Sequence, residues 1–306
     1  MKKDLIRILD LSPKDFGEIF DLTEKLKKKL TGLDEPLKGK NLALIFQKPS
    51  NRTRVSFEVG MHQLGGDTIY LGPDDIKLGV REASGDIARV LSRYVDVIVV
   101  RTFSHNDIEE LAKYSTVPVI NGLSDMYHPC QALADIFTIK EKFGKLKGIN
   151  ISFVGDGNNV LNSLMTGISI LGIDLNIATP KKYEPDKNIF KTALETAKNA
   201  GAKINFTNDP KAAVKNADVI YTDVWTSMGQ EKEAKKRKKA FKDYQVNDKL
   251  LSLAKKDVYV MHCLPAHRNE EITDSCLDGA HSIVLDQAEN RLHVQKALLL
   301  IMLGKA

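Results

Sequence analysis

The stretch Val95-Asp96-Val97-Ile98-Val99-Val100, followed directly by Arg101, decides the fold. It is an almost continuous apolar run, which is typical of a strand buried on both faces, as the strands of parallel sheets are. A segment with helical periodicity precedes it at 84–94, and another follows it at 106–114. Strands that alternate with helices predict a parallel sheet flanked by helices.

The same alternation continues toward both ends of the chain. Further strands are expected at 42–46, 68–71, 117–120, 150–154, 175–178, 219–222 and 258–262. Further helices are expected at 14–30 with Ser12 as the N-cap, at 53–64, 129–143, 160–171 and 189–200, and from about 289 to 303. The segment Gly144-Lys145-Leu146-Lys147-Gly148 separates the two series. We therefore expect an α/β protein of two parallel-sheet domains, residues 1–143 with the C-terminal helix 289–306 packed back onto them, and residues 148–288. The active site should occupy the cleft between them.

Composition places the chain among ordinary globular proteins. Of its 306 residues, 42% are apolar and 28% are charged, and the formal net charge of +5 is too small to predict nucleic-acid binding. The N-terminus has no apolar signal core, and the longest apolar run, 297–303, is too short to span a bilayer. Three irregularly spaced cysteines form no disulfide framework. These features predict a cytoplasmic protein that binds neither membrane nor nucleic acid.

A basic segment follows the strand at 42–46. Ser50-Asn51-Arg52-Thr53-Arg54 opens a helix, where backbone N–H groups attract anions and arginine forks suit phosphate oxygens. Arginines oppose the dipole at a helix N-terminus, so two of them there favour an anion site over a solvated first turn. Arg101 follows a buried strand at the same edge of the predicted sheet, although a surface arginine is an equally good interpretation from position alone.

Two further polar segments begin helices. His128-Pro129-Cys130-Gln131 places a histidine before a helix and an amide one turn into it, although His-Pro is more often a simple helix entry. Gly155-Asp156-Gly157-Asn158-Asn159 follows a strand, and its asparagines could contact a polar ligand. A dinucleotide fingerprint would need a third glycine at position 160, which is Val160.

The last two segments follow strands in the second half of the chain. Asp223-Val224-Trp225-Thr226-Ser227-Met228-Gly229 offers a carboxylate that can hold an ammonium group. The lysine-rich run 232–239 behind it is interpreted as a solvated helix face or mobile loop without chemistry, with few apolar anchors after Met228. His262-Cys263-Leu264-Pro265 offers a thiol, although such cysteines are often buried as small hydrophobes. Neighbouring strand residues face opposite ways, which argues against His262 activating Cys263.

Taken in order, these segments resemble the ornithine carbamoyltransferases of the aspartate/ornithine carbamoyltransferase superfamily. The family's motifs Ser-Thr-Arg-Thr-Arg, His-Pro-x-Gln, Asp-x-x-x-Ser-Met-Gly and His-Cys-Leu-Pro appear at 50–54, 128–131, 223–229 and 262–265. Asn51 replaces the family's threonine, and Lys77 replaces a glutamine in a loop that reaches a neighbouring subunit in the family. The resemblance covers nearly the whole chain and implies a homotrimer or a multiple of trimers.

The resemblance also implies residue roles. It assigns carbamoyl phosphate to Ser50, Asn51, Arg52, Thr53, Lys77, Arg101, His128, Gln131, Cys263, Leu264 and Arg291, and it places Arg54 behind the cradle. It assigns ornithine to Asn159, Asp223, Ser227 and Met228, and catalysis to Arg101, His128, Cys263 and Asp223. No metal or organic cofactor is expected, because carbamoyl phosphate is already activated.

Other functions account for fewer of these residues. A nucleotide-dependent dehydrogenase would need the missing glycine, and an amino-acid-binding sensor leaves the basic segment at 50–54 unexplained. Within the family, putrescine or an acylated ornithine could replace ornithine as acceptor. The carboxylate of Asp223 favours free ornithine, whose α-ammonium needs a partner. The resemblance therefore implies citrulline formation in arginine metabolism, in either the biosynthetic or the catabolic direction.

Overall fold

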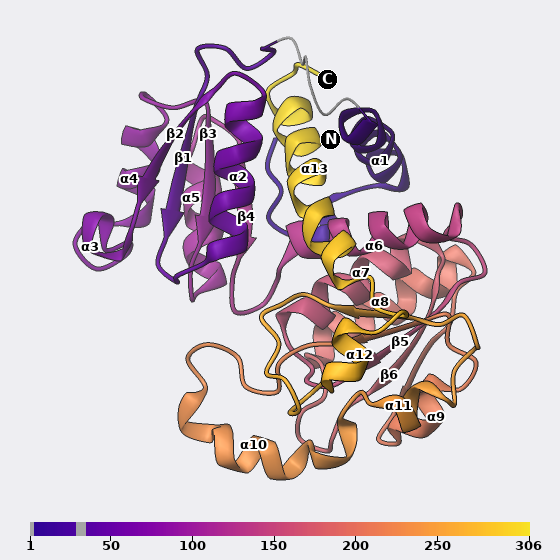
Figure 1. Cartoon of the computed structure of the whole chain (residues 1–306). Helices are drawn as coiled ribbons and strands as arrows, with labels where there is room; N and C mark the ends of the chain where they lie inside the picture. Colours follow the sequence, from indigo (N-terminus) through magenta and orange to yellow (C-terminus); the bar gives the residue numbers. More distant parts are fainter. Residues whose placement is uncertain (1–2, 29–34) are drawn as a thin grey trace. The chain divides into compact units, whose positions relative to one another are not determined.

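The chain divides into two compact units, each built around its own parallel sheet (Figure 1). The computed structural model describes residues 3–28 and 35–306. Unit 1 comprises Met1–Phe137 and Glu289–Ala306, and unit 2 comprises Thr138–Ala288. The predicted fold class is confirmed. The first division lies inside the helix α6 (Pro129–Phe143), whereas the sequence suggested the glycine-flanked segment that follows this helix.

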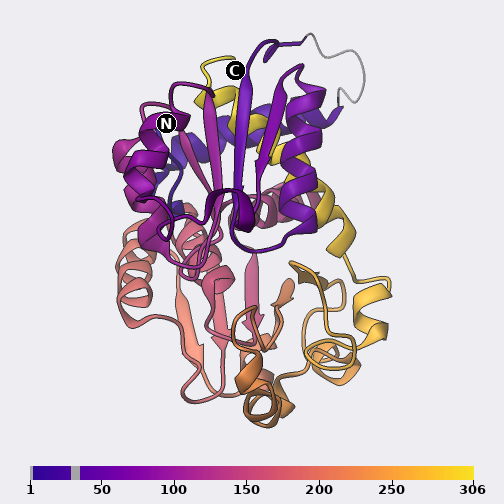
Figure 2. The same ribbon diagram turned by 90° about the vertical axis from the view of Figure 1, so that its left-hand side faces the viewer.

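Unit 1 contains a four-stranded parallel sheet in the order β2-β1-β3-β4. Its strands are β1 (Asn41–Phe46), β2 (Asp67–Leu71), β3 (Val97–Arg101) and β4 (Val119–Leu123), which Figure 2 shows side by side. Its helices are α1 (Pro13–Lys28), α2 (Asn51–Gln63), α3 (Pro73–Ile76), α4 (Ser84–Leu91), α5 (His105–Tyr114), most of α6 and most of α13 (Val284–Met302), with a 3-10 turn η1 (Ile8–Asp10).

The two faces of this sheet are covered by different helices. Ile98 and Val100 of β3 pack with Ile87 of α4 and with Leu111 of α5 in one apolar cluster. The helix α2 lies on the opposite side of the sheet (Figure 1). Every residue of β3 is buried, as the apolar stretch predicted, but the strand begins at Val97 and includes Arg101 as its last residue.

The predicted helix at 14–30 is α1, which begins one residue earlier. The Ser12 hydroxyl accepts a hydrogen bond from the Asp15 N–H at 3.3 Å, as expected of an N-cap residue. Residues 29 and 30 of that prediction lie outside the described residues.

Unit 2 contains a five-stranded parallel sheet in the order β7-β6-β5-β8-β9. Its strands are β5 (Asn150–Val154), β6 (Asp174–Ala178), β7 (Ile204–Thr207), β8 (Val219–Thr222) and β9 (Tyr259–His262). Its helices are α7 (Asn159–Leu171), α8 (Lys187–Ala200), α9 (Pro210–Val214), α10 (Ala234–Ala240), α11 (Asp248–Leu251) and α12 (Asp274–Asp278), with 3-10 turns η2 (Glu231–Glu233) and η3 (Lys242–Tyr244).

The core of unit 2 includes an aromatic cluster from the connection that follows β8. Trp225, Phe241 and Tyr244 are buried in one cluster with Val154 and Val260 of the sheet. The rings of Trp225 and Phe241 stack with their centroids 5.8 Å apart. The connection is therefore anchored by Trp225 before Met228 and by Phe241 and Tyr244 at its far end, with no buried apolar residue at 229–239.

Candidate active site

The basic segment of unit 1 forms the first turn of α2, directly after β1. Ser50 is the N-cap residue, and its hydroxyl accepts a hydrogen bond from the Thr53 N–H at 3.2 Å. The N-terminal N–H groups of α2 thus begin where the strand ends, which is the favoured position for an anion in parallel sheets. The Arg54 side chain is engaged elsewhere: its guanidinium stacks 3.7 Å from the Tyr70 ring centroid, and its Nε donates to Glu58.

Arg101 ends β3 and is only 6% exposed, so the alternative of a surface arginine is wrong. A buried guanidinium requires anionic or polar partners, because its desolvation is otherwise costly. His128, immediately before α6, is 5% exposed. Burial, and then the charges of Arg291, Arg101 and Arg52, hold the pKa of His128 well below its usual value. The imidazole is therefore neutral at pH 7 and surrounded by positive charge.

Arg291 of α13 connects the first turn of α2 to the first turn of α6. Its Nη1 donates to the Gln131 side-chain oxygen at 2.6 Å, and its Nη2 donates to the Thr53 hydroxyl at 3.2 Å. Three elements far apart in sequence thus bring together an arginine, an amide and a hydroxyl that were predicted as site residues. All three side chains are buried, so their positions are fixed before any ligand arrives.

Lys77 does not join this cluster in its own chain. It is exposed and occupies the C-cap of α3 with a left-handed backbone (φ 44°). The buried side chains of Ile76 and Leu78 hold the chain on either side of it. The Gln47 side chain also donates to the Leu78 carbonyl at 3.2 Å. Lys77 is therefore displayed outward from a well-anchored loop.

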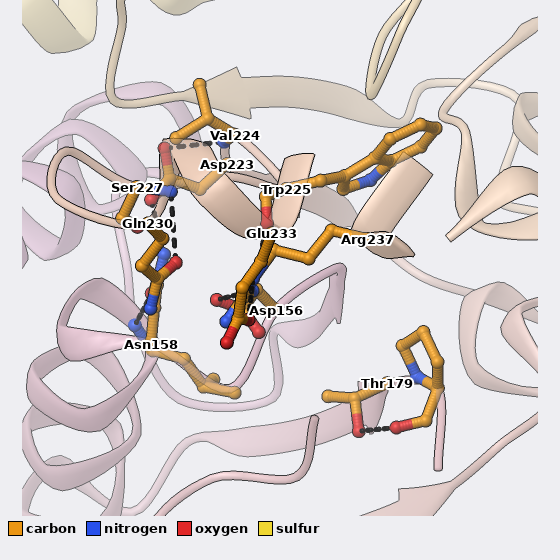
Figure 3. A network of polar contacts seen from close by, with 12 residues as sticks. Asp156, Asn158, Thr179, Asp223, Val224, Trp225, Ser227, Gln230, Glu233 and Arg237 are labelled. Atoms are coloured by element: carbon orange, nitrogen blue, oxygen red, sulfur yellow. Dashed lines mark hydrogen bonds and ion pairs between the residues drawn. The ribbon is translucent and has the colours of Figure 1, made fainter. Parts of the chain in front are cut away.

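Unit 2 gathers its polar residues around Asp223, which follows β8 and is 5% exposed (Figure 3). The Cys263 thiol donates to Asp223 Oδ1 at 2.9 Å, and the Asn158 amide donates to Oδ2 at 2.6 Å. Ser227 and Met228 follow on the same connection, and Met228 is 47% exposed. The carboxylate is held between two strand ends and one helix start.

The sequence indicated that both asparagines at 158 and 159 could contact a polar ligand, but the resemblance assigned a role to Asn159 alone and gave none to Asn158. Its side-chain oxygen caps α7 by accepting from the Val160 and Leu161 N–H groups, which leaves its NH₂ to hold Asp223. Asn159 is the first residue of α7 and is half-buried. The predicted helix began at position 160, which would make Asn159 the N-cap; α7 begins one residue earlier, so the cap is Asn158.

Arg237 corrects the interpretation of the run 232–239 as a solvated segment without a specific role. It is buried, its Nη1 lies 3.0 Å from Asp156 Oδ2, and the same nitrogen donates to the Trp225 carbonyl at 2.9 Å (Figure 3). Burial raises the pKa of Asp156 to about 6, although the Arg237 charge acts against this shift. The remaining lysines 232, 235, 236, 238 and 239 are exposed, as expected.

The segment after β9 is ordered by a buried histidine. The Leu264 N–H donates to His262 Nδ1 at 2.8 Å, and His262 Nε2 lies 3.0 Å from Glu271 Oε1. Side-chain ligand atoms of Asp223, His262 and Cys263 lie within 4.8 Å of one another. Both ring nitrogens of His262 are already engaged, so this arrangement does not offer an open imidazole to a metal ion. We accordingly assign His262 to the polar organisation of this loop.

The two glycines after β5 serve the backbone. A Cβ at Gly157 would collide with the backbone of Glu184 and Pro185, so this position requires glycine for close packing. Gly155 has a φ of 151°, which also favours glycine. Their spacing therefore has a structural explanation and is no evidence for a dinucleotide.

One parallel-sheet unit thus carries a buried basic cluster suited to an anion, and the other carries a buried carboxylate suited to a cationic group. The chain belongs to the aspartate/ornithine carbamoyltransferase family. The family's carbamoyl-P binding domain matches residues 3–141, and its Asp/Orn binding domain matches residues 147–302. The dehydrogenase alternative is therefore wrong, and the resemblance found in the sequence is confirmed.

Known relatives resemble the chain over nearly its whole length. It is 56% identical to the ornithine carbamoyltransferase of Archaeoglobus fulgidus, over 99% of this chain and 98% of that protein. The solved structure of ornithine carbamoyltransferase from Pyrococcus furiosus has a TM-score of 0.96 at 53% identity, covering 99% of this chain and 97% of that one. The anabolic ornithine carbamoyltransferase of Campylobacter jejuni gives 0.94 at 38% identity, with both chains fully covered at 100%.

Proposed function

We propose that the chain transfers the carbamoyl group of carbamoyl phosphate to the δ-amine of L-ornithine and releases L-citrulline and phosphate. The observation that carries this proposal is the buried cluster of unit 1. A neutral His128 there lies within the field of Arg52, Arg101 and Arg291. Such a cluster of like charges is stabilised by a bound anion. The donor cluster lies in unit 1 and the acceptor cluster in unit 2, so the reaction needs residues from both units.

The donor is recognised at its two ends. Ser50, Asn51, Arg52, Thr53 and Arg101 hold the phosphate, where the first turn of α2 adds backbone donors. The carbamoyl oxygen accepts hydrogen bonds from Arg101, Thr53 and His128. The carbamoyl NH₂ is fixed by Gln131 and Arg291, and by the backbone carbonyls near Cys263 and Leu264. The low pKa of His128 supports this role, because a neutral imidazole keeps its donor without adding charge.

The acceptor is recognised through its α-amino acid end. Asp223 pairs with the α-ammonium of ornithine, while Asn159, Ser227 and Met228 hold the rest of that end. Asn158 and Cys263 fix the Asp223 carboxylate by donating one hydrogen bond to each of its oxygens. The Cys263 thiol is thereby a donor to Asp223, which supports a part in orienting the δ-amine and not in covalent catalysis.

The reaction then follows from ordinary amine chemistry. The δ-amine has a reference pKa of about 10.4, so removing its proton at pH 7 costs roughly 4–5 kcal/mol in water. A desolvated site with several guanidiniums lowers that cost. The neutral amine attacks the carbonyl carbon, and the oxyanion accepts hydrogen bonds from positioned donors. The C–O bond to phosphate then breaks, and the departing phosphate takes the extra proton from the nitrogen. Each such donor is typically worth about 3–4 kcal/mol.

The proposal extends to the assembly and the setting of the enzyme. We propose a homotrimer, or a multiple of trimers, in which Lys77 reaches the phosphate of a neighbouring subunit. We also propose a cytoplasmic enzyme of arginine biosynthesis that needs no cofactor. A 53% identical relative in Pyrococcus furiosus is described as anabolic, which supports the biosynthetic direction. Within residues 3–28 and 35–306, no helix is long and apolar enough to cross a membrane.

The acceptor assignment is tested by comparing three amines. Carbamoylated product should form from ornithine and carbamoyl phosphate, while putrescine and N-acetylornithine should react at least tenfold more slowly. Putrescine lacks the α-carboxylate, and N-acetylornithine lacks the α-ammonium that Asp223 would pair with. Colorimetric detection of the ureido product measures all three. Equal rates with putrescine and ornithine would contradict recognition of the α-amino acid group.

Asp223→Asn provides the matching residue test. It keeps the shape and removes the charge, so kcat/KM for ornithine should fall about a hundredfold, while the Kd of carbamoyl phosphate should stay within about twofold. Asp257→Asn, an exposed aspartate of the same unit, is the control and should change neither value. Unchanged ornithine kinetics in Asp223→Asn would make this carboxylate a structural group.

A further inference from the structure

The amide of Gln131 is held at both ends by charged groups. Gln131 lies in the first turn of α6 and is 2% exposed. Its NH₂ donates to Asp135 Oδ1 at 2.8 Å, one turn further along the same helix. Its oxygen accepts from Arg291 Nη1 at 2.6 Å. Asp135 is completely buried, so its interaction with the amide is not screened by water.

These two partners determine which way the amide points. A guanidinium only donates hydrogen bonds, so the amide atom that faces Arg291 is the oxygen, and the NH₂ faces the Asp135 carboxyl group. Rotating the amide by half a turn would set its oxygen against the Asp135 carboxylate and its NH₂ against the Arg291 guanidinium. Both hydrogen bonds would become repulsive contacts inside a buried cluster. The hydrogen-bond partners therefore fix which end of the Gln131 side-chain amide is the oxygen and which is the nitrogen.

Arg291 is itself braced from the side away from Gln131. With the Gln295 amide in the orientation that satisfies both its ends, its oxygen accepts from Arg291 Nη2 at 2.9 Å and from Nε at 3.3 Å. The Thr53 hydroxyl accepts from Nη2 as well, at 3.2 Å. The guanidinium therefore has a fixed plane, and Asp135 supplies the matching restraint on the other end of the amide.

A fixed Gln131 oxygen has a consequence for donor choice. A carbonyl oxygen has two lone pairs, of which the Arg291 hydrogen bond uses one. The other can accept from an N–H group of a ligand. Carbamoyl phosphate carries an NH₂ group at the position where acetyl phosphate carries a methyl group. A site whose buried acceptor needs a donor discriminates strongly against the methyl analogue.

We propose that Asp135 is a positioning residue that sets the preference for a carbamoyl over an acetyl group, by holding the Gln131 oxygen toward the donor. This inference rests on the proposed function, because it requires carbamoyl phosphate in the cluster of unit 1. Asp135 itself does not contact the substrate in this proposal. Asp135 acts through Gln131, and its loss releases the amide to turn.

The test uses two probes that differ only at the end Gln131 would contact, and a third that lacks this end altogether. Phosphonoacetamide is a stable amide analogue of carbamoyl phosphate, 2-oxopropylphosphonate replaces its NH₂ with methyl, and inorganic phosphate lacks the acyl group. Their Kd values are measured by calorimetry. Wild type should prefer phosphonoacetamide to the methyl ketone. Asp135→Asn should reduce that preference about tenfold, while the Kd of inorganic phosphate stays within about twofold.

Two further variants make the test specific. The double variant Gln131→Glu with Asp135→Asn exchanges carboxylate and amide, so that the new NH₂ at 135 donates to an acceptor at 131 that still pairs with Arg291. It keeps the net charge and should restore the preference for phosphonoacetamide. Glu141→Gln removes an exposed carboxylate from the same helix and should leave all three Kd values unchanged.

The outcomes separate this inference from the function on which it rests. A wild type that fails to bind phosphonoacetamide overturns the proposed function. A wild type with the expected preference, combined with an unchanged preference in folded Asp135→Asn, overturns the inference alone. A parallel loss for inorganic phosphate would also overturn it, because Asp135 would then maintain the phosphate cradle. Should Asp135→Asn not fold, a double variant that folds without the preference counts against it equally.

Discussion

Lys296 on α13 is a buried charge that the proposed chemistry does not use. It is 1% exposed, and its ammonium donates to the side-chain oxygen of Gln63 at 2.9 Å. Burial lowers the pKa of Lys296 below its usual value. The aliphatic stem passes against Gly60 of α2, where a Cβ would lie 3.3 Å from the Lys296 Cγ. The stem thus contributes packing, while the ammonium costs desolvation free energy.

Lys296→Met keeps the stem and removes the charge. We expect the free energy of unfolding at pH 7 to rise by about 1 kcal/mol, because a desolvated charge is replaced by an apolar group of similar length. Gln63 is exposed, so its oxygen can hydrogen-bond to water instead. Urea unfolding measures the change. Lys25→Met, an exposed lysine of α1, is the control and should change the value by less than about 0.5 kcal/mol.

The pH dependence of this difference has a definite sign. In the unfolded chain the lysine keeps its usual pKa of about 10.4, whereas in the folded state the value is lower. Between the two values the unfolded state binds more protons, so wild type gains stability as the pH rises. The advantage of Lys296→Met should therefore shrink between pH 7 and pH 10. An advantage that grows with pH would contradict the assignment of its cause to the lysine charge.

Single residues were predictable where position in the fold fixes their role. Arg101 could be placed at the carboxyl edge of a sheet from the apolar run before it, but its burial depends on side chains from other elements. Arg237 lies in a run of lysines, and nothing in that pattern distinguishes the one guanidinium that pairs with Asp156. Asn158 and Asn159 are adjacent, and only the helix start separates their roles.

At the scale of elements, the connection from Asp223 to Tyr244 is held by an ion pair and an aromatic cluster. Arg237 joins Asp156 at the end of β5 to the Trp225 carbonyl, which lies between Asp223 and Ser227 in sequence. The guanidinium also lies 4.9 Å from the Tyr183 ring centroid. This pair fixes the backbone from which the proposed ornithine contacts extend.

Arg237→Met should therefore destabilise the protein and weaken the acceptor site. Leaving Asp156 buried without its partner should cost about 3 kcal/mol in the free energy of unfolding. KM for ornithine should rise at least tenfold, and the Kd of carbamoyl phosphate should stay within about twofold. Adding Asp156→Asn should recover part of the stability, because the unpaired carboxylate is removed. Lys239→Met, an exposed neighbour on α10, should behave as wild type.

The accuracy of the predicted elements followed their length and periodicity. The helix at 129–143 and the strands at 150–154 and 219–222 agree with α6, β5 and β8 at both ends. The strand β7 and the helices α9 to α12 were not predicted, because segments of four to seven residues carry too little periodic signal. α13 begins at Val284 and not near Glu289, since its buried polar residues conceal the apolar pattern.

At the scale of the whole molecule, the loop after α3 points to a role for a second copy of the chain. Lys77 is exposed, and Val80 is 85% exposed. Ile76 and Leu78, on either side of Lys77, are buried. The loop base is further held by the hydrogen bond from Gln47 to the Leu78 carbonyl. An anchored loop that displays a lysine and an apolar side chain is suited to contact another subunit. This feature supports the proposal that Lys77 completes a neighbour's phosphate site.

Mixing two inactive variants tests that proposal. Lys77→Ala removes the group given to a neighbour, and Arg101→Ala disables the site of its own subunit. If Lys77 acts across subunits, randomly mixed trimers contain sites with both residues intact, and about a quarter of wild-type activity should return. If Lys77 acts within its own chain, every site lacks one residue and the mixture stays inactive. Citrulline formation after denaturation and joint refolding measures the recovery, and mass spectrometry of the intact oligomers must show hybrids. Hybrid trimers without activity would place Lys77 outside the neighbour's site.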